Sequence, residues 1–145
     1  MAEVEEVAGK EISKEHVSRR VEDWIKRINE LYDQIEIWLP DGWKAERKRS
    51  VFMEEEMMLK SAVSGRRLPI LDLISSSGSR ASVEPRGLWI IGANGRADLF
   101  AGDKQFVLVD AADAFLPSKW KIADFSARNK SELLNEATLV AALVQ

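Results

Sequence analysis

Apolar and polar residues alternate with a helical repeat over residues 13–38. Apolar residues recur there at spacings that alternate between four and three, as in an amphipathic helix. The stripe consists of Val17, Val21, Trp24, Ile28, Leu31, Ile35 and Trp38. Ile25 and Tyr32 widen it beyond a narrow coiled-coil seam, so we expect the helix to pack on the protein's own sheet. Pairing of two such helices in a dimer is the alternative.

Polar and turn-forming residues mark the ends of this helix. Ser13 can accept hydrogen bonds as the N-cap, and Pro40-Asp41-Gly42 stops the helix. Residues 1–12 lack apolar periodicity, and we expect a flexible tail there. Residues 13–145 then form a single domain.

The middle of the chain predicts a connector, a short helix and a strand. Residues 42–50 are rich in Lys and Arg and indicate a solvated connector, with a basic patch that touches nucleic acid as the alternative. Ser50 as N-cap and Gly65 after the last turn indicate a second helix. The apolar run at 68–74 has the length of a strand, and a serine-rich loop follows it.

The strongest strand signals lie between Leu88 and Asp110. Asn94-Gly95 favours a type I′ hairpin turn, and Gly102-Asp103 favours a second two-residue turn. We therefore predict a three-stranded antiparallel meander. Counting outward from the second turn places Asp98 opposite Val107.

The same register divides the meander into two faces, because side chains alternate along a strand. One face is apolar, with Leu99 between Ile90 and Phe106. The other face is mixed and carries Trp89, Ile91, Arg96, Asp98, Phe100, Gln105, Val107 and Val109. This second face is either partly wet or a binding site.

A further strand and a helix are expected near the C-terminus. Residues 118–124 alternate, and Asn129 with Glu132 resembles a capping box that opens a helix. The stripe of that helix is Leu133, Ala137, Val140 and Val144. The predicted fold is α+β: an antiparallel sheet centred on residues 88–110 and extended by 68–74 and 118–124, covered by the long N-terminal helix and the C-terminal helix.

Composition excludes more functions than it suggests. The 145 residues include no Cys and one His, and 21 basic against 24 acidic residues give a net charge of −3. Thiolate nucleophiles and Cys-ligated metals are excluded, and the acidic balance makes nucleic acid an improbable partner. His16 alone cannot form a His-rich metal site or a triad. The acidic N-terminus and short apolar runs predict a cytoplasmic protein that does not bind membranes.

One pattern resembles an enzyme family over a short stretch. Arg96-Ala97-Asp98, a hairpin and Val109-Asp110-Ala111-Ala112 loosely resemble the Asp…(Asp/Glu)-x-Lys arrangement of the restriction-nuclease superfamily. Ala112 stands where that pattern has Lys. The register also places Asp98 and Asp110 on opposite faces, so both cannot lie within about 2.1 Å of one Mg²⁺. A metal-dependent hydrolase or nuclease-like domain with these catalytic carboxylates therefore remains the alternative. A β-bulge could restore the parity, and Glu84 or Lys104 could substitute for a missing group.

The favoured hypothesis is a binding surface. Trp89 and Phe100 lie beside Arg96 and Asp98 on the mixed face, and binding sites combine aromatic and polar groups in this way. An ion pair between Arg96 and Asp98 would explain these two residues without a ligand. We expect a small non-enzymatic protein-interaction or regulatory domain that self-associates as a homodimer, without cofactor or metal. The sequence does not identify its protein partner.

Overall fold

A long helix runs along the molecule and buries the predicted stripe. In the computed structural model, which describes residues 2–89 and 93–144 and the side chains from residue 14 onward, α1 spans Ala2–Trp38. The stripe residues from Val17 to Ile35 are buried, together with Tyr32, and Trp38 packs against the core while partly exposed. The helix and its apolar face are therefore confirmed.

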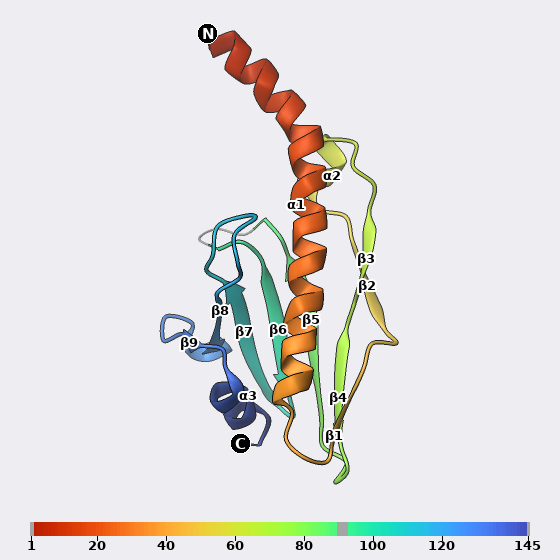
Figure 1. The fold of residues 1–145 in the computed structure, drawn as a ribbon, viewed down its shortest axis with the longest axis vertical. Helices are drawn as coiled ribbons and strands as arrows, with labels where there is room; N and C mark the ends of the chain where they lie inside the picture. Colours follow the sequence, from red (N-terminus) through yellow and green to blue (C-terminus); the bar gives the residue numbers. More distant parts are fainter. Residues whose placement is uncertain (1, 90–92, 145) are drawn as a thin grey trace.

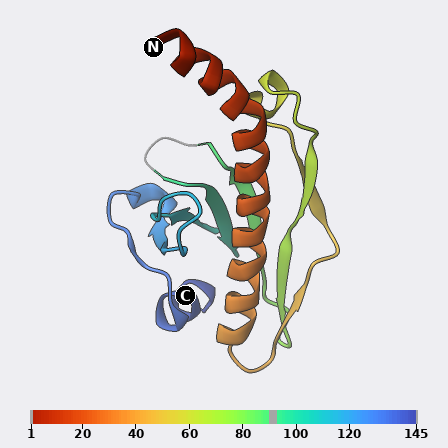
Figure 2. The same cartoon turned by 45° about the horizontal axis from the view of Figure 1, so that its top comes forward.

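The helix begins well before the predicted N-cap, so Ser13 lies inside α1. Residues 2–12 contain no Pro and are rich in Ala, Glu and Val. Ala and Glu favour helices, and Glu near an N-terminus complements the helix dipole. This part of α1 extends beyond the sheet (Figures 1 and 2), which explains why it lacks the apolar stripe. The flexibility of residues 1–12 stays a prediction.

Within residues 2–89 and 93–144, seven strands form one antiparallel sheet, in the order β1-β4-β5-β6-β7-β8-β9. Their bounds are Trp43–Glu46 (β1), Leu71–Ser75 (β4), Arg80–Gly87 (β5), Arg96–Ala101 (β6), Lys104–Asp110 (β7), Trp120–Asp124 (β8) and Glu132–Leu133 (β9). A separate two-stranded ribbon pairs β2 (Ser50–Met53) with β3 (Arg66–Pro69). The short helices are α2 (Glu56–Lys60), η1 (Phe125–Ala127) and α3 (Glu136–Leu143). No helix in the described part of the chain could cross a membrane.

The helices α1 and α3 pack on the same face of the sheet, which we call the inner face (Figure 1). Leu99 and Leu108 point from the strands into the core that Ile28 of α1 and Leu139 of α3 complete. The predicted α+β class, an antiparallel sheet covered by an N-terminal and a C-terminal helix, is thus confirmed. The opposite face, which carries Asp98 and which neither α1 nor α3 covers, is called the outer face.

The second predicted hairpin has the register that the sequence indicated. Asp98 pairs with Val107 and Ala101 with Lys104 across β6 and β7. Gly102, the first residue of the two-residue turn, has a φ of +63°, a value that glycine adopts without steric cost. Every residue on these two strands therefore lies on its predicted face.

The first predicted hairpin is wrong. β5 pairs with β6 through Val83 and Leu99, so Val83 takes the place expected for Ile90, which lies outside the described residues together with Ile91. Asn94-Gly95 is not a type I′ turn, because that turn needs a positive φ at both residues and only Gly95 has one. The strand ends early because Glu55 accepts hydrogen bonds from the backbone N–H groups of Leu88 and Trp89, at 2.9 and 3.3 Å.

Two predictions for residues 42–65 are also wrong. The expected connector contains β1, and the expected helix begins with the ribbon strand β2 and is helical only over the five residues of α2. Gly65 precedes β3 and caps no helix. Short apolar segments fit either helix or strand locally, and their pairing with distant segments decides between the two. The predicted strand at 68–74 is split between β3 and β4.

The C-terminal helix is shorter than predicted, and the residues that it buries differ from the predicted stripe. Its capping box is Asn135 with Thr138, each side chain accepting a hydrogen bond from the other residue's backbone N–H. Asn129 and Glu132 do not cap it, because Glu132 belongs to β9, which pairs with β8. The buried residues of the helix are Leu139, Ala142 and Leu143, whereas Leu133 and Val144 of the predicted stripe are exposed.

Replacing Gly95 with Val is expected to destabilise the fold far more than the same change at Gly78. Both glycines have a positive φ, +108° and +94°, so each valine meets backbone strain of roughly 1–3 kcal/mol. A Cβ at residue 95 would also lie 2.1 Å from the ring of Trp24, whereas nothing lies within 4 Å at residue 78. Urea denaturation of the two variants measures the difference. Equal losses would show that Gly95 does not pack against Trp24.

Candidate functional site

The two candidate carboxylates lie on opposite faces of the sheet. Asp98 faces Val107 on the outer face, and Asp110 points from the end of β7 to the inner face. Both side chains are 0% exposed. No group of three or more His, Cys, Asp or Glu residues that could hold a metal occurs among residues 2–89 and 93–144. The geometry therefore gives Asp98 and Asp110 no shared site, and the carboxylate that lies opposite Asp98 on the outer face is Glu84.

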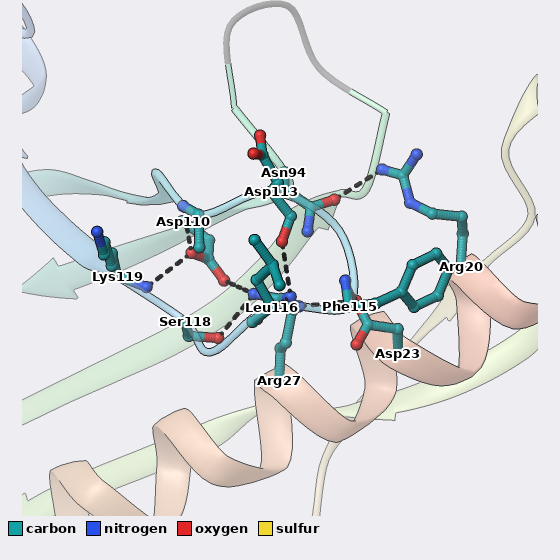
Figure 3. Close-up of polar contacts among 11 residues, drawn as sticks. Arg20, Asp23, Arg27, Asn94, Asp110, Asp113, Phe115, Leu116, Ser118 and Lys119 are labelled. Carbon is teal, nitrogen blue, oxygen red and sulfur yellow. Dashed lines mark hydrogen bonds and ion pairs between the residues drawn. The ribbon is translucent and has the colours of Figure 1, made fainter.

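Asp110 is held by a buried arginine of α1. The Nη1 group of Arg27 donates to Asp110 at 2.5 Å and to Ser118 at 3.0 Å, while its Nε group donates to Asp23 at 2.7 Å. Its Nη2 group donates to the backbone carbonyls of Asp113, at 3.0 Å, and Leu116. Figure 3 shows this network between α1 and the loop at 111–119. These bonds match the five N–H donors of a guanidinium.

The remaining bonds of Asp110 close the same loop. Its other carboxylate oxygen accepts from the backbone N–H groups of Ala112, at 3.0 Å, and Lys119, at 2.9 Å. Burial by itself lowers the pKa of Arg27, but the hydrogen bonds to Asp23 and Asp110 outweigh it, and the net pKa is raised. Because donors and acceptors are used within the chain, this network anchors the loop and leaves no group free for chemistry.

Trp89 lies apart from the other candidate binding residues. The guanidinium of Arg20 lies 5.7 Å from the centre of the Trp89 ring and donates to Asn94 at 2.7 Å. Burial lowers the pKa of Arg20, and the Asp23 carboxylate opposes this shift. The prediction that Trp89 shares a face with Asp98 is wrong, because β5 ends at Gly87 and the alternation does not continue to Trp89.

The outer face brings together Arg96, Asp98 and Phe100. Arg96 donates to the two oxygens of Asp98 at 2.9 and 3.2 Å, Gln105 donates at 3.1 Å, and Arg86 lies 3.3 Å away. Asp98 is fully buried although neither α1 nor α3 covers it, whereas the side chain of Arg86 is 52% exposed. Side chains of the sheet therefore bury Asp98, and Arg86 reaches solvent above it.

Sequence reasoning missed the aromatic residue beside this cluster. Phe125 is 41% exposed, and guanidinium carbons of Arg96 and Arg128 lie 5.9 and 4.6 Å from the centre of its ring. The signal was present, because the alternation of β8 continued by one position puts Phe125 on the side of Lys121 and Ala123. The predicted strand ends at residue 124, so Phe125 is not among the predicted binding residues.

The outer face over β5–β8 carries a surplus of positive charge. Arg86, Arg96, Lys121 and Arg128 contribute basic groups, and Glu84 and Asp98 contribute acidic ones. The whole chain has a net charge of −3, so charge is distributed unevenly over the molecule. Arginine and aromatic side chains together are enriched among the residues that contribute most to protein–protein affinity.

Comparisons of the chain with family models, with curated proteins and with solved structures found no match in any of the three. Inferences about function therefore rest on the side chains and surfaces of this chain. Among the described surfaces, the outer face around Asp98 and Phe125 brings a buried carboxylate, basic groups and exposed aromatic surface closest together.

Replacing the two carboxylates should affect stability independently. Asp110→Asn weakens the buried partner of Arg27, and we expect it to lower the free energy of unfolding by about 3 kcal/mol. Asp98→Asn should lower it by about 1–2 kcal/mol, because Arg86 remains partly solvated.

The double variant should show the sum of the two losses within about 0.5 kcal/mol, and Mg²⁺ should leave the melting temperature of each protein unchanged. Urea and thermal denaturation with and without Mg²⁺ measure both quantities. A non-additive loss that depends on Mg²⁺ would instead indicate a shared metal site.

Proposed function

We propose that this protein is a non-enzymatic interaction domain that self-associates, and that the outer face around Asp98 is its interface. One observation carries the proposal: an uncovered sheet face presents exposed Arg86 and Phe125 above a carboxylate that is fully buried. A rigid, buried polar centre with arginine and aromatic groups around it is suited to protein contacts. The hydrogen-bonding groups of Arg27 and Asp110 are used within the chain, so this pair is not part of the proposed interface.

The occupant that we favour is the N-terminal part of α1 from a second copy. Residues 2–15 contain five of the 24 acidic residues and two of the 21 basic residues. This segment alone therefore carries a charge of −3, the net charge of the whole chain. Its charge is complementary to the basic outer face, and complementary charge guides association.

The segment cannot reach the outer face of its own chain. α1 lies along the inner face, and its first turns extend past the end of the sheet (Figures 1 and 2). A helix of this length measures roughly 20 Å, and four adjacent strands measure roughly 14 Å across. The segment is thus long enough to cross β5–β8 of a neighbour, and reciprocal exchange would close a twofold dimer.

Sedimentation velocity over a range of protein concentrations tests the proposal. We expect a monomer–dimer equilibrium that weakens as salt is added, because exposed charges are screened. Arg86→Glu with Arg128→Glu should abolish the dimer, and so should Glu11→Lys with Glu15→Lys. The matched control is Lys26→Glu with Lys60→Glu, which makes the same charge change as the arginine pair at exposed sites on α1 and α2 and should leave the dimer intact.

Mixing the two dimer-deficient variants adds a sharper criterion. Their reversed charges are complementary, so we expect the mixture to form heterodimers. A wild-type chain that stays monomeric at every concentration would contradict self-association. Dimers that survive reversal of Arg86 and Arg128 would place the interface elsewhere.

A further inference from the structure

A groove on another side of the molecule is lined by two tryptophans. It has a volume of about 330 Å³ and lies between the second half of α1, the end of the loop at 111–119 and Leu134. Trp38 and Trp120 contribute aromatic surface, and Leu31 and Pro117 add aliphatic surface. None of the residues of the outer-face cluster lines this groove, so it is separate from the proposed interface.

The tryptophans of the groove are anchored, yet partly exposed. Trp120 packs on the buried Trp24, with ring centres 6.0 Å apart, and its backbone carbonyl accepts a hydrogen bond from Leu134 at 3.0 Å. Trp38 ends the apolar stripe of α1 and is also only partly buried. Part of the surface of these two large side chains therefore remains available beside the groove.

The groove also has an acidic side. Glu30 is exposed on α1 and lines it together with Gln34, one turn further on. The nearby guanidinium of Arg27 is paired with Asp23 and Asp110, so its charge is largely neutralised locally. Aromatic surface beside an unneutralised carboxylate attracts cations, because indole rings present a negative face.

We propose that this groove binds a compact alkylated ammonium group. The alkyl groups would contact Trp38, Trp120 and Pro117, and Glu30 would supply the opposite charge. A neutral apolar ligand would use the same walls but would gain nothing from the carboxylate. A free quaternary amine and a methylated lysine side chain share this chemistry.

Binding is tested on the full chain with choline and with the neutral alcohol in which carbon replaces the choline nitrogen. The readout is the indole N–H signal of each tryptophan in two-dimensional NMR spectra. We expect saturable shifts of the Trp38 and Trp120 signals with choline, and affinity for the alcohol that is about tenfold lower. Equal affinity for the two molecules would overturn the proposal and reduce the groove to an apolar pocket.

Single substitutions test how much each side chain of the groove contributes to binding. Glu30→Gln is exposed and isosteric, and we expect it to weaken choline binding several-fold while leaving binding of the alcohol unchanged. Trp38→Leu should abolish the choline shifts, whereas Trp43→Leu, a matched change outside the groove, should preserve them. Should Trp38→Leu fail to fold, Glu30→Gln and the ligand pair still decide the question. Shifts that are unaffected by Glu30→Gln would contradict a role for the carboxylate.

The source of the ammonium group is examined with a peptide that contains trimethyllysine and with its unmodified form. Binding of the methylated peptide above the level of choline would identify a protein-borne ligand. Binding of choline with no preference for the methylated peptide would identify a free amine, and absence of saturable shifts with every probe would overturn the proposal. None of these results depends on the oligomeric state, so failure here leaves the proposed self-association untouched.

Discussion

The structure depends on one buried ion pair, between Arg27 of α1 and Asp110 at the end of β7. Two charges removed from water are costly unless their hydrogen-bonding groups are satisfied. The remaining N–H groups of the guanidinium donate hydrogen bonds to Asp23, Ser118 and two backbone carbonyls. The second oxygen of the carboxylate accepts hydrogen bonds from backbone N–H groups on both sides of the loop. The pair thus joins the helix to the sheet and fixes the loop between β7 and β8. Apolar burial along α1 supplies stability, while this pair ties one turn of the helix to the end of β7 and to the following loop.

This arrangement separates the molecule into an inner and an outer side with different properties. Asp110 is fully hydrogen-bonded on the inner side, and the acidic residues of the outer face over β5 and β6 are Asp98 and its cross-strand partner Glu84. Two arginines approach Asp98, and the four basic groups of this face outnumber the two acidic ones. The surplus positive charge, with Phe125 beside it, is the basis on which we propose an acidic partner for the outer face. The function that we favour therefore follows from the alternation of side chains along the strands, which places Asp98 and Asp110 on opposite faces.

Local sequence patterns predicted the structure correctly where the geometry depends on a single segment of the chain. The stripe of α1 follows from helical spacing, and the β6–β7 register follows from a two-residue turn, so both could be counted from the chain. The β5–β6 connection could not, because Glu55, far away in sequence, takes the N–H groups of Leu88 and Trp89 and ends the strand. Likewise, Glu132 and Leu133 join the sheet edge, and the helix expected there begins only after Asn135.

The sequence by itself determined the class of fold, the buried side of α1 and the placement of Asp98 and Asp110 on opposite faces, because alternation within a strand and repetition along a helix are local properties of the backbone. Only the tertiary structure decided what those residues contact. Arg27 showed no pattern that named Asp110 as its partner across 83 positions, and Glu55 showed none that named the backbone N–H groups of Leu88 and Trp89. Such contacts arise from the packing of distant segments, and no local repeat encodes them.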